Sequence, residues 1–327
     1  MKQKKKQKVA FVFPGQGSQV VGMSKSFYNV LPWAKEAYGA ADEILGFGLS
    51  KIALEGPPEE LNKTENTQPA LLVASLIALG ALKASFPLEP ILMAGHSLGE
   101  YTALVASGAL QFTDAVTLVH KRGLFMQEAV PSGTGAMAAV IGLDAAKVEE
   151  VCTAASEAES VVVPANINSP AQVVVSGAAE AVERLSLLAK EAGAKRVIPL
   201  KVSAPSHSPL MAPAAVRFAE ELKSIEFEKP NVPIVSNVKA TPTASRKEFP
   251  ELLTSQLTSP VRWVETIERM KAEGVEVIIE IGPGSVLTGL TKRIDKSIQT
   301  YSLASVEDLG ELSKVFGEAP DRGDKSW

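Results

Sequence analysis

Short apolar runs alternate with amphipathic stretches in the first part of the chain. Lys8 to Phe13 predicts a buried strand that leads into the glycine-rich turn Pro14 to Ser18, and Ile91 to Ala94 predicts a second strand with a glycine-rich turn after it. Helical patterns lie between and after these strands. Such alternation is typical of an α/β sheet with parallel strands, in which ligands bind at the carboxyl ends of the strands. Both glycine-rich turns are expected at such ends.

From Gly135 the pattern of apolar positions changes. It predicts strands at 136–143, 160–165, 172–176 and 196–202 and helices at 145–158 and 178–192. The order β-α-β-β-α-β is the signature of a ferredoxin-like unit, and about seventy residues are enough for a small domain.

The first pattern then resumes, with helices from Pro209 and Pro260 and strands at 232–238 and 275–281. We therefore expect an α/β fold in which residues 1–131 and 203–316 form the core. The ferredoxin-like unit, residues 132–202, is expected to be an insertion in that core. Residues 317–327 are polar and turn-rich, which predicts a flexible tail.

Composition places the chain among ordinary globular proteins. It has 327 residues, of which 46% are apolar and 21% charged. The longest apolar stretch, Pro69 to Leu82, is too short to cross a bilayer and suits a helix buried on all sides. The lysine-rich start is followed by too short an apolar run for a signal peptide. The single cysteine, Cys152, excludes an internal disulfide and a cysteine-based metal cluster, and it fits a reducing cytoplasm.

The formal net charge of -4 argues against nucleic acid as the main partner. The composition gives no reason to expect a membrane partner. Because no apolar stripe is obvious beyond those that the predicted core would bury, we expect a monomer. A soluble cytoplasmic enzyme is the interpretation that these properties favour.

The most informative motif is Gly95-His96-Ser97-Leu98-Gly99, which follows the second predicted strand and precedes a helix-like stretch from Glu100. A serine at a sharp strand-to-helix turn projects its hydroxyl outward, and the flanking glycines leave room for a tight backbone. The helix N-terminus also favours a developing oxyanion. Ser97 is therefore a candidate nucleophile. A serine that merely caps a helix is an almost equal alternative for this motif alone.

A nucleophilic serine needs a base, most often histidine. His96 is the immediate neighbour of Ser97, so the two side chains diverge, and His120 falls inside a predicted helix. His207 instead follows a strand and precedes a helix that Ser208 and Pro209 are expected to open. A histidine satisfied within a loop is the weaker interpretation of His207, which we predict to be the base.

Two further positions are candidates for the site. No carboxylate stands out as the group that orients the histidine, whereas Gln256 precedes the predicted helix start at Ser259 and Pro260 and offers a neutral carbonyl. Arg122 interrupts an apolar helical stripe, so the cation is expected to be buried and to need a partner. A structural salt bridge is the default explanation, and a substrate carboxylate held by the guanidinium fork is the alternative.

Together these residues resemble one family, the malonyl-CoA:acyl-carrier-protein transacylases of fatty-acid synthesis. The resemblance runs from Val9 to about Leu303. Each motif is weak alone, but their order is specific. The motifs are Phe13 to Gln19, Thr67 to Leu71, Gly95 to Tyr101, Pro205 to Ser208, Gln256 to Trp263 and Ile281 to Gly284.

The resemblance implies a hydrolase-like α/β core with a ferredoxin-like subdomain, and it assigns roles to the candidate residues. Ser97 would be acylated, with His207 as its base and a Gln256 carbonyl orienting the histidine. The backbone amides of Gln16 and Leu98 would form the oxyanion hole. These roles belong to a mechanism in which the acyl group passes through a serine ester.

The resemblance also implies the substrates. Arg122 would grip the malonyl carboxylate, and the malonyl group would pass from malonyl-CoA to the phosphopantetheine thiol of acyl carrier protein. Neither a metal nor a redox cofactor is implied. In related multidomain synthases, a serine at the position before the histidine, which is Ser206 here, goes with a preference for methylmalonyl. A phenylalanine at that position goes with malonyl. Malonyl is still the donor that we expect.

Three other functions share parts of this pattern. A serine esterase or thioesterase has the same turn around its nucleophile, but it has no use for an arginine in its acyl pocket. A catalytically idle module that docks carrier protein would not need the set of Ser97, His207, Gln256 and Arg122. A trans-acting acyltransferase of a polyketide synthase would need the same residues, so the sequence does not separate it from an enzyme of fatty-acid synthesis.

Overall fold

The structure is a computed structural model, and it describes residues 7–131, 133–200 and 204–317. Its larger sheet has the strand order β10-β9-β1-β2-β7-β8. The neighbouring strands from β10 to β7 are parallel, and only β8 runs antiparallel to β7. The predicted parallel sheet is therefore confirmed. Its strands are β1 (Val9–Phe13), β2 (Pro90–Gly95), β7 (Ile234–Val235), β8 (Pro242–Thr243), β9 (Val277–Ile281) and β10 (Gln299–Leu303).

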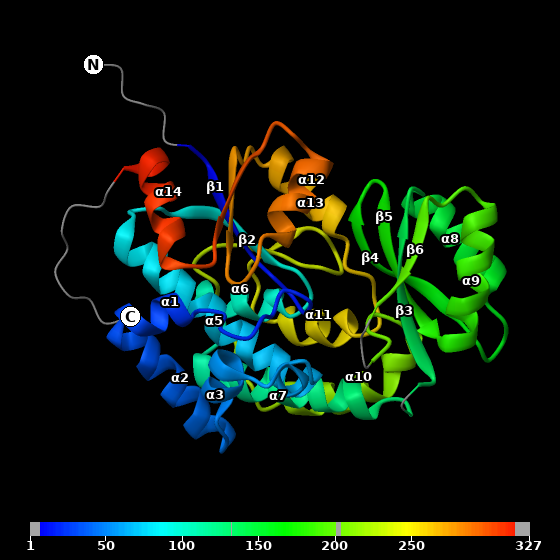
Figure 1. Cartoon of the computed structure of the whole chain (residues 1–327), viewed down its shortest axis with the longest axis horizontal. Coiled ribbons are helices and arrows are strands. Elements are labelled where there is room, and N and C mark those ends of the chain that lie inside the picture. The colour runs from blue at the N-terminus through cyan, green and yellow to red at the C-terminus, as the bar shows by residue number, and fades with distance from the viewer. Residues whose placement is uncertain (1–6, 132, 201–203, 318–327) are drawn as a thin grey trace.

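Alternate side chains of the central strand β1 enter two different cores, because successive residues of a strand point to opposite faces. Phe11 and Phe13 pack in a core built mainly from α5 (Thr64–Ser85), α7 (Phe112–Glu128) and their neighbouring helices. Ala10 and Val12 pack against α12 (Trp263–Ala272) and α13 (Val286–Ile294). The sheet thus lies between two layers of helices, with α12 and α13 above it and α5 and α7 below it in Figure 1.

The helix α5 is longer than the apolar run that predicts it. Its 22 residues are long and apolar enough to cross a membrane, but 83% of its apolar window is buried inside the molecule. Residues all around the helix are buried, as expected for the central helix of a core. The larger sheet and the helices outside residues 133–200 form what we call the larger half of the molecule, and residues 133–200 form the smaller half. The remaining helices of the larger half are α1 (Lys25–Val30), α2 (Pro32–Leu45), α3 (Leu49–Glu55), α4 (Pro58–Leu61), α6 (Gly99–Ala106), α10 (Ala212–Leu222), α11 (Phe249–Gln256) and α14 (Val306–Phe316).

The smaller sheet has the strand order β4-β5-β3-β6, and all of its neighbouring strands are antiparallel. Two helices cover one face, on the right of Figure 1. The other face carries Met137, Ala139, Ala165 and Val174. The predicted order β-α-β-β-α-β is present. Its elements are β3 (Gly135–Ile141), α8 (Ala145–Ala155), β4 (Val162–Ser169), β5 (Gln172–Ala178), α9 (Ala179–Glu191) and β6 (Arg196–Pro199).

The predicted helix start at Pro260 is wrong, because tertiary pairing holds that segment extended. The Val261 amide donates to Ala165 O at 2.8 Å, and the Ile167 amide donates to Val261 O at 2.9 Å. The segment thus adds itself to β4, and α12 begins only at Trp263. This pairing connects the larger half of the molecule to the smaller one.

Other boundaries also differ from the prediction. The predicted strand 232–238 is reduced to β7, because the Ala240 amide donates to Ser236 O and turns the chain. A 3₁₀ turn, η1 (Pro209–Met211), precedes α10. Three elements are not predicted by the sequence patterns, namely β8, β10 and α14. The predicted tail falls almost wholly outside the described residues, which end at Gly317, and the predicted strand to residue 202 runs into the undescribed segment 201–203.

Candidate active site

The turn between β2 and α6 has the strained geometry that its motif predicts. Ser97 lies in the left-handed region, with φ of 50°, which costs a residue with a side chain about 1–3 kcal/mol. A Cβ on Gly95 would lie 1.8 Å from the Gly99 carbonyl carbon, and one on Gly99 would lie 2.1 Å from Phe13 O. Only glycine fits at both positions, so this backbone presents Ser97 at the end of the strand.

His207 lies beside Ser97. Ser97 Oγ and His207 Nε2 are 2.8 Å apart. The other ring nitrogen, Nδ1, lies 2.7 Å from Gln256 O and 3.1 Å from Ser259 O. Because both partners of Nδ1 are carbonyl oxygens, we assign the proton of the neutral ring to Nδ1. Nε2 then has a free lone pair directed at the serine hydroxyl, as a general base requires.

The surroundings of His207 keep its ring neutral. The side chain is only 3% exposed, and burial together with the nearby Arg122 cation lowers its pKa to about 3. The histidine backbone is also fixed, because its amide donates to Leu257 O at 3.1 Å. The ring is therefore neutral and held in place at every pH at which the protein is expected to work.

The group that orients the histidine is a backbone carbonyl, and it belongs to the last residue of α11 rather than to a loop. The structure thus brings Gln256 to His207, and it adds Ser259 as a second acceptor that the sequence does not indicate. The sequence pattern indicates Ser259 only as a helix cap. Its carbonyl is free to face His207 because the chain stays extended up to α12.

Arg122 is buried beside the same hydroxyl. It is 1% exposed, and its terminal nitrogens donate to Gln68 Oε1 at 2.7 Å, Gln256 Oε1 at 3.0 Å and Ser97 Oγ at 3.3 Å. Within the described parts of the chain, no carboxylate forms an ion pair with it. The default prediction of a structural salt bridge is therefore not met there. Burial lowers the pKa of the guanidinium, and an anionic ligand would compensate this loss of hydration.

The two candidate oxyanion donors, Gln16 and Leu98, line the same cavity as Ser97. A Cβ on Gly15 would lie 2.2 Å from His96 O, so the first glycine-rich turn packs directly on the second. Neither the Gln16 amide nor the Leu98 amide donates to an acceptor among the described residues. An oxyanion hole requires amides of this kind, without protein acceptors, on residues that line the site.

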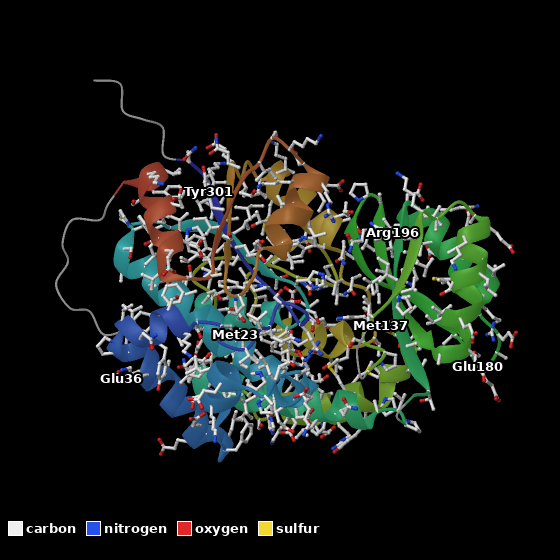
Figure 2. All side chains as sticks on the ribbon, viewed as in Figure 1. Met23, Glu36, Met137, Glu180, Arg196 and Tyr301 are labelled. Atoms are coloured by element: carbon white, nitrogen blue, oxygen red, sulfur yellow. The ribbon has the colours of Figure 1, made fainter. Side chains whose placement is uncertain are left out.

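Both halves of the molecule line this cavity, which has a volume of ≈ 670 Å³. Met137, Asn166 and Leu200 come from the smaller sheet and the residues just after it. Met137 is labelled in Figure 2, where the smaller sheet meets the larger half. The candidate residues Ser97, His207 and Arg122 all come from the larger half. The cavity has the size of a small-molecule site, and Ser97 lines it.

The other two histidines have different surroundings. His96 Nε2 lies 2.8 Å from Asn168 Oδ1, and the ring packs against Trp263, so burial lowers its pKa. His120 Nδ1 lies 2.9 Å from Glu65 O, and the ring packs against Phe47. Neither ring contacts Ser97 Oγ, so His207 is the histidine that lies beside it. In the described ranges, no three His, Cys, Asp or Glu side chains gather in a geometry that would hold a metal ion.

Comparison with known proteins independently supports the family that the sequence motifs indicate. The acyl transferase domain family matches residues 10–314. The chain is 49% identical over 314 residues to the malonyl CoA-acyl carrier protein transacylase of Bacillus subtilis, covering 96% of this chain and 99% of the relative. An acyl carrier protein S-malonyltransferase from Vibrio cholerae has a TM-score of 0.90 at 47% identity, covering 94% of this chain and 100% of the other.

A third relative was solved with a partner. It is a malonyl-transacylase in complex with a type II polyketide-synthase acyl-carrier protein, with a TM-score of 0.90 at 46% identity, covering 93% of this chain and 98% of that one. The identity and the coverage exceed what a shared fold alone would give. The chain therefore belongs to the acyl transferase domain family and, within it, to the malonyl CoA-acyl carrier protein transacylases.

Proposed function

We propose that the protein transfers a malonyl group from malonyl-CoA to the phosphopantetheine thiol of acyl carrier protein, through an ester on Ser97. One observation carries the proposal: Ser97 Oγ lies 2.8 Å from a neutral histidine and 3.3 Å from a buried arginine. The histidine activates a nucleophile, and the arginine selects an acyl group that carries its own negative charge. The names of the relatives agree with this chemistry.

In the first half of the reaction the Ser97 hydroxyl proton passes to His207 Nε2 while Oγ bonds to the thioester carbonyl carbon. The negative charge that forms on the carbonyl oxygen is held by the amides of Gln16 and Leu98. The carbon-sulfur bond then breaks, and the CoA sulfur leaves with the proton from His207. Each oxyanion donor of this kind contributes about 3 kcal/mol to transition-state stability.

The second half runs in the opposite direction with a new thiol. The phosphopantetheine thiol gives its proton to His207 Nε2, and its sulfur bonds to the ester carbonyl carbon of malonyl-Ser97. When the carbon-oxygen bond breaks, Ser97 Oγ recovers the proton. The carbonyls of Gln256 and Ser259 stabilise the ring while it is charged, because they accept from Nδ1 throughout.

Arg122 provides the specificity for the donor. Its direct hydrogen-bond partners are neutral oxygens, and the nearby Glu100 carboxyl bonds to Asn237 and Gln256 instead, so the cation can still pair with a carboxylate placed beside Ser97. A malonyl carboxylate would replace the serine hydroxyl as a partner and would restore the interactions that the buried cation lacks. A serine thioesterase acting on uncharged acyl groups would gain nothing from this cation.

The proposal also includes the organisation of the chain. Residues 1–131 and 203–316 form a hydrolase-like α/β core, and residues 132–202 form a ferredoxin-like subdomain; the parallel larger sheet and the strand order of the smaller sheet support these two assignments. We propose a cytoplasmic monomer that uses no cofactor besides its substrates. Sedimentation of the purified protein with and without carrier protein tests the oligomeric state.

A second pathway is also proposed, because one solved relative was captured with a carrier protein of a polyketide synthase. The same malonyl transfer would then supply polyketide synthesis. The two alternatives differ only in the carrier protein. Transfer rates to fatty-acid and polyketide carrier proteins, compared at equal concentration, distinguish them.

The test of the main proposal is the mass of the protein after mixing with malonyl-CoA, followed by addition of carrier protein. We expect one malonyl group on the peptide that contains Ser97, and its transfer when carrier protein is added. The Ser97→Ala variant should remain unmodified, whereas Ser206→Ala, which changes a neighbouring cavity hydroxyl, should still be acylated. Rapid release of free malonate without transfer would favour a thioesterase, and an unmodified wild-type Ser97 would favour an idle docking module.

A further inference from the structure

Asn237 contacts the backbone of the nucleophile turn although it is far from it in sequence. It follows β7, where the chain turns away from the sheet, and it is completely buried. The Ser97 amide donates to Asn237 Oδ1 at 2.8 Å, and Asn237 Nδ2 donates to Gly95 O at 2.7 Å. A single planar amide therefore holds the backbone on both sides of His96.

These two bonds act on the strained part of the turn. The left-handed conformation of Ser97 persists only if its surroundings fix it. The bond to Oδ1 fixes the amide of Ser97, and the bond from Nδ2 fixes the end of β2 two residues earlier. Because the Ser97 amide is occupied in this way, it cannot serve an oxyanion, and that role is left to the next amide, at Leu98.

Asn237 is itself held by a buried carboxylate. Glu100 Oε2 accepts from the backbone N–H of Asn237 at 3.2 Å and from Gln256 Nε2 at 2.7 Å. Gln256 Nε2 also donates to Ser97 O at 3.1 Å. Because its Nε2 faces these acceptors, the amide of Gln256 must present Oε1 to Arg122. Glu100 thus fixes the nucleophile turn and the arginine together.

We propose that Asn237, held by Glu100, is a positioning residue that keeps Ser97 in the conformation from which its hydroxyl reaches His207. The inference rests on the proposed acyl transfer, and it adds two residues that touch no substrate. Asn237 is expected to affect the rate of acylation and not the choice of donor. A side chain with only a structural role would instead change the amount of folded protein.

The experiment measures the rate constant of acylation in a single turnover with malonyl-CoA and with acetyl-CoA, per folded molecule. Asn237→Ala removes both bonds to the turn. Its matched control is Ser236→Ala, since Ser236 is equally buried next to Asn237 and its hydroxyl has no partner among the described residues. The wild-type protein measured in parallel tests the proposed function separately, because its failure to be acylated would reject that proposal first.

We expect Asn237→Ala to lower the acylation rate roughly a hundredfold with both donors, because a small displacement of reacting atoms has an effect of this size. The apparent dissociation constant of malonyl-CoA should stay the same, and Ser236→Ala should react like the wild type. A wild-type rate in Asn237→Ala would overturn the inference. A change in the ratio of the two donors would overturn it as well, because it would place Asn237 in the acyl pocket.

A second pair of variants keeps the test valid if Asn237→Ala does not fold. Asn237→Asp keeps the acceptor for Ser97 but replaces the donor to Gly95 O, so its acylation should be slower than that of the wild type. Glu100→Met removes the acceptor of Asn237 and Gln256, whereas Glu100→Gln retains an oxygen in its place. Recovery of most of the rate in Glu100→Gln compared with Glu100→Met is the expected result. Equal rates for these two variants and the wild type would overturn the role of Glu100.

Discussion

The two halves of the molecule contribute different things to one cavity. The larger half supplies every side chain that is proposed to react, namely Ser97, His207 and Arg122. The smaller half supplies wall residues such as Met137 and Asn166. The open face of the smaller sheet carries apolar residues, whereas the other side of the cavity carries a buried cation. The proposed chemistry therefore belongs to one part of the chain, and part of the cavity wall that surrounds the substrate belongs to another.

The same contrast appears in the energetics. The larger half contains the left-handed Ser97 and His207 and the buried charged groups Glu100 and Arg122. Each of these costs free energy, which the extensive core around α5 and β1 offsets. The smaller half is a regular antiparallel sheet with two helices, and within its described residues 133–200 only glycines have positive φ. This comparison suggests that a large core is needed where strained and charged groups must be held.

The largest expected effect tests the chemistry assigned to the larger half. Arg122→Ala should reduce acylation by malonyl-CoA about a hundredfold more than acylation by acetyl-CoA, because only the malonyl group loses a charged partner. The ratio of the two values of kcat/KM measures this difference. Lys121→Ala is the control, since Lys121 forms a partly exposed pair with Glu221 at 2.7 Å. Equal losses with both donors would contradict the role of Arg122 as a carboxylate clamp.

A smaller effect should follow from a change in the wall of the smaller half. Met137→Ala is expected to raise KM for malonyl-CoA about tenfold with little change in kcat, because the lost contact stabilises bound donor and transition state alike. Steady-state kinetics on protein checked for folding measure both constants. Ile198→Ala, on the partly exposed strand β6, is the control. A fall in kcat without a change in KM would show that this half also takes part in the chemistry.

The smallest effect concerns stability and distinguishes two buried groups of the larger half. The pKa of His207 falls from 6.5 to about 3 on folding, so the unfolded chain binds more protons between these values and acid destabilises the fold. Burial raises the pKa of Glu100 from 4.5 to about 7, so the folded chain binds more protons there and acid has the opposite effect. Between pH 4.5 and 6.5 the two contributions oppose each other.

Glu100→Gln removes one of these contributions. Its free energy of unfolding should therefore fall more steeply with acid than that of the wild type over this pH range, by about 1 kcal/mol per pH unit. Urea titrations at several pH values measure the slope. The exposed Glu191→Gln serves as the control and should keep the wild-type slope. A slope in Glu100→Gln equal to the wild-type slope would show that Glu100 titrates at an ordinary pKa in the folded protein.

Sequence patterns predict the parts of this molecule that depend on local interactions. The glycines around Ser97 indicate the sharp turn, and the interrupted stripe at Arg122 indicates a buried cation, because both signals lie within one element. The parallel sheet is confirmed, and so is the family. The roles of Ser97, His207, Gln256, Gln16, Leu98 and Arg122 stay predictions that the geometry supports.

The parts that sequence patterns miss depend on contacts between distant segments. Asn237 stands in a turn without any motif that marks it, and only the pairing of β2 with β7 brings it to Ser97. Pro260 has the local signal of a helix start, but bonds to β4 keep Val261 extended. Gln68 belongs to a family motif, and yet its contact with Arg122 appears only when α5 packs on α7. Tertiary pairing overrides local preference at each of these positions.

The extended segment before α12 has a mechanical consequence. Through Val261 it is bonded to β4 of the smaller half, and through Ser259 O it accepts from the ring of His207. A hinge motion that swung the smaller half outward would pull on this segment and disturb the proton-carrying side of the base. Keeping the two halves closed therefore preserves the alignment of His207 with Ser97.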